Sequence, residues 1–253
     1  MTANRRRLSV FVIVKNEADR IEECLKSVAG LADEIVVLDS GSSDGTVDIA
    51  KRYATVHQTD WPGFSAQRNR ALGLVSGEWV LSIDADERLT PGLREEIDHA
   101  LALPDLDATL IKMPWRTYFC GKPLRYGRYT SPQGKLFLRE GARYSTRPVH
   151  EQLLLPVRKV MNLKSPLDHH SWRNYLHAQE KHLQYAWLLA GHKKAQGKTS
   201  SMTYACLRFF TDFFQQYLLR LCILDGWRGF LMSVILGQYA FHKYAALSSL
   251  RDD

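Results

Sequence analysis

The first half of this chain alternates between two hydrophobic periods, and this alternation limits the folds it can adopt. Residues 8–14, LSVFVIV, form a continuous apolar run with the length of a buried strand. The next segment repeats apolar residues at helical spacing through Ile21, Leu25 and Val28, and it ends at Gly30. Such an alternation predicts βαβ units and a mostly parallel sheet with helices on both faces.

The same alternation continues as far as residue 115. It predicts strands at 34–40, 55–58, 78–84 and 108–115, and helices at 44–54, 65–75 and 90–103. From Arg116 the sequence is rich in Gly, Pro and aromatic residues, which predicts loops with an antiparallel extension, and after Trp172 it is helical. We therefore expect an α/β domain at 1–170 and a helical C-terminal region at 171–253.

The composition is typical of a folded globular protein, and its positive net charge favours an anionic partner. Apolar residues make up 45% and charged residues 24% of the chain, and the net charge of +7 suits a phosphorylated ligand, a nucleic acid or an acidic membrane surface. The four cysteines lack metal-ligand spacing, which indicates reduced cysteines in a cytosolic protein. The first apolar run is too short for a signal peptide, and no run is long enough to span a membrane.

Polar clusters follow three of the predicted strands. They are Lys15-Asn16-Glu17 after the first strand, residues 39–46 (DSGSSDGT) after the second and Asp84-Ala85-Asp86 after the fourth. Ligands of an open parallel sheet bind beyond the carboxyl ends of its strands, so the three clusters should share one rim. Each cluster alone could be a loop or a cap. Together they predict a ligand site, and the helix that starts there suits a phosphate.

Asp84 and Asp86 carry the sharpest chemical signal. Side chains two residues apart at a strand end point the same way, and two carboxylates held close repel unless they share a cation or a proton. Hard oxygen ligands suit Mg²⁺ or Mn²⁺, with substrate phosphates completing the coordination. The alternative is that Asp86 and Glu87 only begin the helix expected at Thr90.

Four segments, in order, resemble the family 2 glycosyltransferases of the GT-A fold. They are FVIVKNEADRIEECLKSV, EIVVLDSGSSDGTVDIAKRY, AQRNRALGLVSGEWVLSIDADERL and RPVHEQL, and they span about the first two-thirds of the chain. The DADE and PVHE segments and a DGWRGF turn are similar to those of lipopolysaccharide core-biosynthesis glycosyltransferases. This resemblance implies a Rossmann-like GT-A sheet and inverting, metal-dependent transfer from a UDP-sugar. It also implies a lipopolysaccharide inner-core acceptor, with glucose added to a heptose as the first choice.

The resemblance also implies roles for single residues on the rim. Asp39 matches the acid that contacts the uridine base, and Glu17 matches a residue near the uridine. Arg68 matches a position facing the diphosphate, although it could instead lie on a solvated helix face. Of the DxD pair, Asp86 is the more direct metal ligand and Asp84 is oriented towards the ribose and the metal.

The VHE segment supplies the remaining implied residues. Glu151 is the expected base that accepts the proton of the acceptor hydroxyl, and His150 is a further metal ligand or a phosphate contact. Asp86 and Glu87 stay open as alternative bases.

The C-terminal helices have unusually wide apolar faces. In residues 204–224 the polar side chains occupy one narrow stripe, which is typical of a helix that is buried or lies in a membrane interface. Between Arg158 and Arg208, nine Lys and Arg residues stand against two acids. This excess favours an anionic membrane surface over a homodimer contact, and we expect the protein at the cytoplasmic face of the bacterial inner membrane.

Other classes fit the sequence less well. A sugar nucleotidyltransferase would share the sheet and the carboxylates, but it should carry a Gly-rich loop where this chain has KNEADR. A nucleic-acid-binding module is disfavoured because the charge lies on the tail and no recognised motif is present. A dinucleotide oxidoreductase would need GxGxxG after the first strand. Transfer to another cell-surface glycan or lipid-linked acceptor is the alternative within the family.

Overall fold

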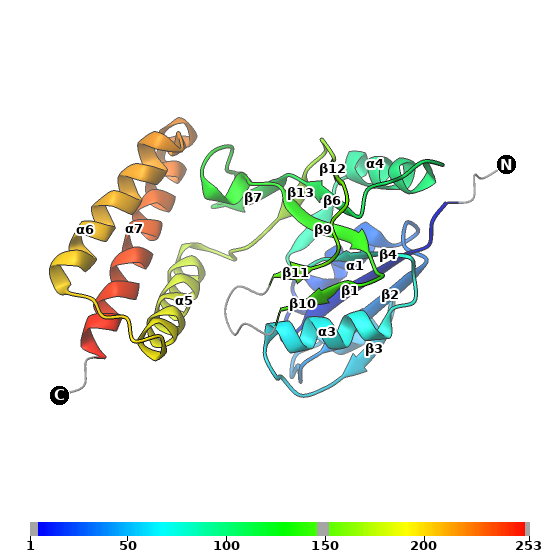
Figure 1. The fold of residues 1–253 in the computed structure, drawn as a ribbon, viewed down its shortest axis with the longest axis horizontal. Coiled ribbons are helices and arrows are strands. Elements are labelled where there is room, and N and C mark those ends of the chain that lie inside the picture. Colours follow the sequence, from blue (N-terminus) through cyan, green and yellow to red (C-terminus); the bar gives the residue numbers. More distant parts are fainter. Residues whose placement is uncertain (1–4, 146–151, 251–253) are drawn as a thin grey trace. The chain divides into compact units, whose positions relative to one another are not determined.

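The computed structural model describes residues 5–145 and 152–250, and the chain forms two compact units (Figure 1). The first unit contains the residues up to 115 together with 132–169, and the second contains 116–131 and the residues from 170 onward. The predicted division at residue 170 differs from this one by the segment 116–131.

Within the described residues, the first unit is built on a seven-stranded sheet of order β12-β6-β9-β4-β1-β2-β3. Its strands are β1 (Leu8–Val14), β2 (Glu34–Asp39), β3 (Thr55–Gln58), β4 (Trp79–Ser82), β6 (Leu110–Met113), β9 (Gln133–Leu138) and β12 (Val160–Asn162). β1 pairs in parallel with β2 and β4, β2 with β3, and β12 with β6, whereas β9 runs antiparallel to β4 and β6. The prediction of a mostly parallel sheet is therefore confirmed.

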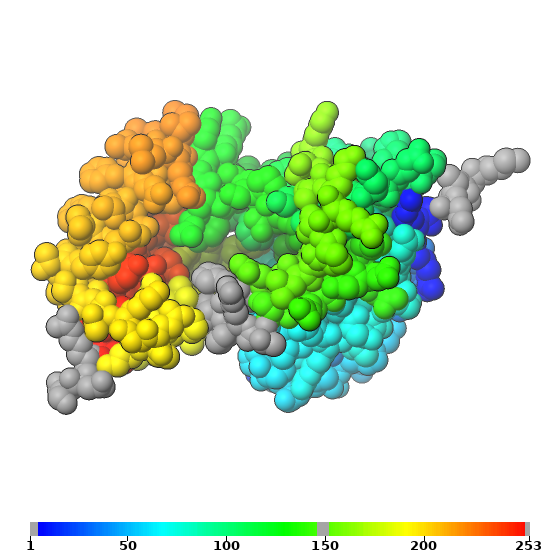
Figure 2. Space-filling view, in the orientation of Figure 1, coloured from blue at the N-terminus to red at the C-terminus, as the bar shows by residue number. Residues whose placement is uncertain are grey.

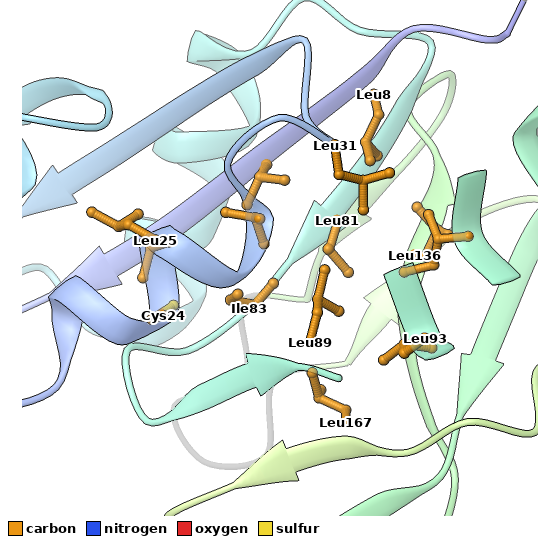
Figure 3. Packing of buried hydrophobic residues seen from close by; sticks show 14 of the residues in the cluster. Leu8, Cys24, Leu25, Leu31, Leu81, Ile83, Leu89, Leu93, Leu136 and Leu167 are labelled. Atoms are coloured by element: carbon orange, nitrogen blue, oxygen red, sulfur yellow. The ribbon is translucent and has the colours of Figure 1, made fainter. Parts of the chain in front are cut away.

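Helices cover both faces of this sheet, because its central strands are apolar on both sides. Val10 and Val12 of β1 face α1 (Ile21–Val28) and α4 (Pro91–Ala102), and Figure 3 shows Leu25 and Leu93 of these helices in the same cluster. Phe11 of β1 lies on the other face, in a cluster with residues of α3 (Phe64–Leu74). The short α2 (Thr46–Ala50) follows the loop after β2.

The chain after β4 corrects one expectation. Glu87 does not begin a helix but starts β5 (Glu87–Leu89), which pairs antiparallel with β13 (Leu167–His169). α4 begins only after Thr90, whose side chain accepts a hydrogen bond from the Leu93 N–H at 3.3 Å, and Pro91 occupies the first helical position. Asp86 and Glu87 are therefore not the start of this helix. A second small antiparallel pair joins β10 (Arg143–Tyr144) and β11 (Leu153–Leu154).

The second unit is mainly helical. It contains the hairpin of β7 (Trp115–Phe119) and β8 (Lys122–Pro123), the 3₁₀ turn η1 (Arg128–Thr130), and the helices α5 (Tyr175–Ala195), α6 (Met202–Phe214) and α7 (Gly226–Ser249). A π-helical turn η2 (Gln215–Leu219) and a 3₁₀ turn η3 (Cys222–Asp225) join α6 to α7, which pack as a hairpin in Figure 1. Residues 116–131 belong here because Phe119 and Leu124 share a core with Trp172 and Met232.

These elements confirm the predicted fold class: an α/β sheet flanked by helices and followed by a helical C-terminal part. Across the described residues, no helix has the length and apolar character needed to cross a membrane.

Candidate functional site

The loop after β2 is organised by Asp39, which is fully buried at the end of that strand. Its carboxylate accepts hydrogen bonds from the N–H groups of Gly41 and Ser42, both at 3.0 Å, and from the Ser42 hydroxyl. A carboxylate offers about four lone-pair positions, so these three bonds leave about one for a ligand. The residue expected to contact uridine therefore also fixes the loop that would surround it.

The loop after β1 is tied to the same region. The Asn16 side chain accepts from the Ser43 N–H at 2.8 Å, and the Glu17 N–H donates to the Thr46 hydroxyl at 2.9 Å. Asn16 itself has a φ of 55°, a left-handed conformation that Asn adopts more readily than most residues. The first two predicted polar clusters thus form one continuous rim, as the strand-end argument requires.

Asp84 lies beyond β4 and is held by two cationic side chains. Arg68 on α3 donates to its Oδ1 at 2.7 Å, and Lys135 on β9 donates to its Oδ2 at 2.8 Å. Burial alone would raise the pKa of Asp84, but these two cations hold it well below its usual range. The Arg68 side chain is only 12% exposed and also donates to the Ser82 hydroxyl at 2.9 Å, so a solvated helix face is the wrong interpretation of Arg68.

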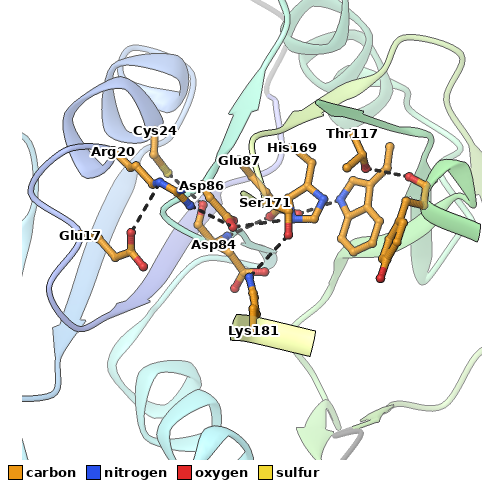
Figure 4. A network of polar contacts seen from close by, with 12 residues as sticks. Glu17, Arg20, Cys24, Asp84, Asp86, Glu87, Thr117, His169, Ser171 and Lys181 are labelled. Atoms are coloured by element: carbon orange, nitrogen blue, oxygen red, sulfur yellow. Dashed lines mark hydrogen bonds and ion pairs between the residues drawn. The ribbon is translucent and has the colours of Figure 1, made fainter. Parts of the chain in front are cut away.

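Asp86 has different and looser partners (Figure 4). Its Oδ2 lies 3.6 Å from a guanidinium nitrogen of Arg20 and 3.7 Å from Nε2 of His169. The His169 ring stacks on Trp115 with a centroid distance of 4.3 Å. Both contacts are longer than a hydrogen bond, so Asp86 is held less tightly than Asp84.

Glu87 is enclosed. It is 0% exposed, and its carboxylate accepts from the Asp84 N–H at 2.9 Å, from Trp115 Nε1 at 2.7 Å and from Lys135 Nζ at 2.5 Å. Burial raises the pKa of Glu87 to about 7, against the opposing pull of Lys135. A general base must be free to take up the proton it removes, and the Glu87 carboxylate is already bonded to three donors, one of which is the charged ammonium of Lys135. Glu87 instead fixes the positions of Asp84 and Trp115 through these buried hydrogen bonds.

The described residues could bind a divalent cation through one carboxylate, with the other ligands supplied by the substrate and water. Among residues 5–145 and 152–250, no three His, Cys, Asp or Glu side chains are grouped so that they alone could hold a metal ion. Mg²⁺ commonly needs only one or two protein carboxylates, because substrate phosphates and water complete its shell. Asp86 suits this role, since both Asp84 oxygens are already paired. The predicted residues His150 and Glu151 lie outside the described residues.

Four residues of this site were missed by the sequence reasoning: Arg20, Trp115, Lys135 and His169. Three of them come from segments outside the motifs around β4, and β9 and β13 bring Lys135 and His169 next to the acids. Arg20 stands inside the first motif, where it reads as an ordinary surface residue at a helix start, yet it is only 7% exposed. Its contact with Asp86 joins residues that are distant in sequence, so no local pattern indicates it.

Comparisons with known proteins identify the family of the chain. Residues 9–151 match the sequence profile of "Glycosyl transferase family 2". The "Lipopolysaccharide core biosynthesis glycosyltransferase LpsC" of Rhizobium meliloti (strain 1021) is 30% identical over 250 residues, covering 92% of this chain and 89% of that protein. An "Uncharacterized glycosyltransferase" of Rickettsia bellii (strain RML369-C) is 29% identical over 98% of this chain and 87% of its own length.

Among solved structures, S. aureus TarS 1–349 is similar with a TM-score of 0.49 and 18% identity, covering 73% of this chain and 64% of that one. The profile match spans more than half of the chain, and the LpsC match spans nearly all of it. The chain therefore belongs to glycosyltransferase family 2.

Proposed function

We propose that this glycosyltransferase moves a hexose, glucose as the first choice, from a UDP-sugar to a hydroxyl of the lipopolysaccharide inner core. The reaction inverts the anomeric centre, depends on a divalent cation and takes place at the cytoplasmic face of the bacterial inner membrane. The acceptor class is supported by the relative LpsC, which is named for lipopolysaccharide core biosynthesis and matches nearly the whole chain. Another cell-surface glycan or lipid-linked acceptor is the alternative.

The observation that carries this proposal is the pair Asp84 and Asp86 beyond β4, with their unequal partners. Asp84 is fixed by Arg68 and Lys135, whereas the contacts of Asp86 with Arg20 and His169 are both longer than 3.5 Å. One carboxylate is thus immobilised and the other is able to exchange a protein partner for a ligand. This division suits a site that receives a cation together with its substrate.

The chain's own residues would divide the work as follows. Asp39, with its remaining lone pair, accepts a hydrogen bond from the uracil ring, and Glu17 lies near the uridine. Arg68 places a permanent positive charge beside Asp84, towards the diphosphate. Asp86 would hold the cation, which supplies charge neutralisation for the departing nucleotide diphosphate. His150 would be a further ligand of the cation or a phosphate contact.

Glu151 is the proposed base. It accepts the proton of the attacking acceptor hydroxyl, a contribution of roughly 10²- to 10⁴-fold in rate. Because Glu87 is bonded to the Lys135 ammonium and Asp86 is assigned to the cation, Glu151 is the remaining candidate of the three. The change Glu151→Gln should lower kcat by that factor while UDP affinity is retained. A full loss of UDP affinity would instead assign Glu151 to donor binding.

Calorimetric titration with UDP tests the donor site. UDP should bind in the presence of Mn²⁺, and binding should be lost with EDTA and in Asp86→Asn. The matched control is Asp105→Asn, an exposed aspartate in the loop before β6, which should bind like the parent. Binding that persists in EDTA and in Asp86→Asn would make Asp86 structural and end the metal-dependent proposal.

The reaction class needs a separate assay. With a UDP-hexose and purified inner-core lipopolysaccharide, a glycosyltransferase releases UDP and adds the mass of one hexose to the acceptor. A nucleotidyltransferase would instead release pyrophosphate from UTP and a sugar 1-phosphate. Testing several UDP-sugars side by side identifies the sugar, and a preference for a sugar other than glucose would correct that part of the proposal.

A further inference from the structure

We propose that the end of the second unit where α6 turns into α7 is a docking surface for an anionic lipid bilayer. Large apolar side chains cluster here on the surface, and Figure 2 shows this end in orange. Leu219 is 80% exposed, Leu224 61% and Trp227 58%. We call the exposed apolar residues of this turn the apolar tip: Phe214, Leu218, Leu219, Leu221, Ile223, Leu224, Trp227 and Phe230. Apolar clusters of this kind on a protein surface mark interaction sites.

The backbone of the tip is irregular, although a regular turn could connect α6 to α7. α6 ends in the π-helical turn η2, and Leu221 follows with a φ of 59°. A left-handed conformation is costly for leucine, and such strain persists only where the surroundings fix it. A simple helical turn ending in glycine would join two helices without exposing so many large side chains.

Three polar side chains of the tip form hydrogen bonds with the preceding loop and fix the tip to it. The Asp225 carboxylate accepts from the N–H groups of Arg125 and Tyr126 at 3.1 Å. Arg228 Nε donates to the Cys120 carbonyl at 3.2 Å. The buried Gln216 side chain accepts from the N–H of Arg128 at 3.3 Å, which adds a third anchor. At the tip, polar side chains therefore bond to the rest of the unit while large apolar side chains are exposed. On most protein surfaces the apolar side chains are buried and the polar ones are exposed.

The charge around the tip identifies its partner. Residues 116–131 and 170–250 contain thirteen Lys and Arg residues against three acids. Asp212 is paired with Arg208 at 2.7 Å, and Asp225 is one of the three anchors. Arg125, Arg128 and Arg220 are exposed and either belong to the tip or bond to it through their backbone, and we call them the basic collar.

An apolar surface bordered by arginines matches an anionic bilayer. The leucines and aromatic rings enter the acyl boundary, the arginines reach the phosphates, and a tryptophan such as Trp227 is favoured at the level of the headgroups. Each basic residue near the surface adds to the attraction to anionic lipid. A twofold contact with a second copy would instead place the basic collar of one chain against that of the other, which like-charge repulsion opposes.

Vesicle binding by the full chain tests the inference, and it is measured without any sugar donor. A failure to bind vesicles would therefore leave the UDP titration unaffected, and a failed titration would not alter this result. The protein should sediment with phosphatidylcholine vesicles that contain phosphatidylglycerol, bind less to phosphatidylcholine alone, and dissociate as salt is raised. Equal binding to both vesicle types in high salt, or none to either, would overturn the proposal.

Matched variants assign the binding to the tip. Leu219→Ser with Leu224→Ser should weaken vesicle binding by roughly tenfold or more. Leu176→Ser with Leu188→Ser removes two leucines of α5 that are 64% and 57% exposed, and it should change binding little. Circular dichroism and thermal melting establish that both pairs fold. Equal losses in the two pairs, or no loss in the first, would contradict the assignment.

Two further measurements test the contribution of positive charge to lipid binding and the possibility that the tip binds a second copy of the chain. Arg220→Glu should weaken the preference for phosphatidylglycerol, whereas Lys51→Glu, at an exposed lysine of the first unit, should leave it unchanged. Sedimentation velocity reports the oligomeric state of the parent and of the serine pair at the tip. A parent dimer that the serine pair converts to monomer would show that the tip binds a second copy, and the bilayer proposal would be wrong.

Discussion

Lys135 Nζ lies 2.5 Å from Glu87 Oε2 and 2.8 Å from Asp84 Oδ2, so one ammonium group bridges two acids of the site. Burial would lower the pKa of Lys135, but the two carboxylates outweigh it and raise the pKa above its usual value. Lys135 is therefore charged at all physiological pH values. This lysine, together with Arg68, holds Asp84 in place, and it comes from β9, which runs antiparallel to its neighbours β4 and β6.

The first prediction concerns this bridge. Lys135→Met should reduce the free energy of unfolding by about 3–5 kcal/mol, because Glu87 loses its buried cation and Asp84 loses one of the two cations that hold it. The control is Lys159→Met, since Lys159 pairs with Asp107 at 2.9 Å on the surface and should contribute less than about 1 kcal/mol. Urea denaturation measures both. Adding Glu87→Gln to Lys135→Met should cost less than the separate losses combined, and strict additivity would contradict the bridge.

The acids of this site were predictable because they stand at strand ends, which apolar runs mark locally. Asp39 follows one such run and Asp84 another, and a parallel sheet brings such ends to one edge. Lys135 was not predictable in the same way. Its segment, QGKLFL, is a strand with a lysine near its start, which is typical of an edge strand with a solvated end. Only the pairing of β9 with β4 places this lysine beside Asp84.

The division of the chain into two units also depends on contacts that local sequence patterns do not predict. Residues 116–131 follow the α/β pattern directly, so continuity assigned them to the first domain. Their core contacts are instead Phe119 and Leu124 with Trp172 and Met232, more than forty residues further on. Local periodicity predicts elements, whereas the partner of an element depends on side chains that no local pattern contains.

The second prediction concerns two glycines with opposite surroundings. A Cβ at Gly77 would lie 2.6 Å from the Ser9 hydroxyl and 2.7 Å from the Ser9 backbone nitrogen, whereas a Cβ at Gly73 in α3 meets nothing within 4 Å. Gly77→Ala should therefore destabilise the protein by about 1–3 kcal/mol. Gly73→Ala should stabilise it by about 0.5–1 kcal/mol through helix propensity. Thermal melting distinguishes the two, and equal effects would be inconsistent with the packing around Ser9.

The third prediction follows from His182 in the second unit. Its Nδ1 lies 2.6 Å from the Ala178 carbonyl, and its Nε2 lies 2.8 Å from the Tyr129 hydroxyl. Since a carbonyl only accepts, Nδ1 carries the hydrogen and Nε2 accepts from Tyr129. The neutral ring is thus fully satisfied, and burial lowers the pKa of His182 from 6.5 to about 4.

This lowered pKa makes stability depend on pH. As pH falls below 6.5, His182 becomes protonated in the unfolded chain, whereas in the folded chain it stays neutral until about pH 4. The contribution is present above pH 6.5 and is lost as pH falls towards 4, a loss of about 3 kcal/mol at the lower limit. Urea denaturation across this window should show a shallower pH slope for His182→Gln than for the parent. His192→Gln on the same helix is the control, and equal slopes for the parent and His182→Gln would refute the assignment.

The last prediction separates the two roles of Asp39. In Asp39→Asn, the amide oxygen still accepts from the N–H groups of Gly41 and Ser42, and the amide nitrogen can donate to the Ser42 hydroxyl, so the loop should persist with little change in melting temperature. The negative charge is lost, however, and a charge-assisted bond to the uracil ring is worth about 1.5–3 kcal/mol. UDP affinity should therefore fall roughly tenfold to a hundredfold.

The matched variant for Asp39→Asn is Asp44→Asn in the same loop. Asp44 accepts from the N–H groups of Ala18 and Thr46, both at 3.1 Å, and so resembles Asp39 in fixing the loop but not in its proposed contact with uridine. UDP calorimetry on the two variants decides the matter. A loss confined to Asp39→Asn assigns base recognition to that carboxylate, because the loop geometry is common to both. Equal losses would mean that donor binding senses the shape of the loop and that Asp39 acts on it only through Gly41 and Ser42.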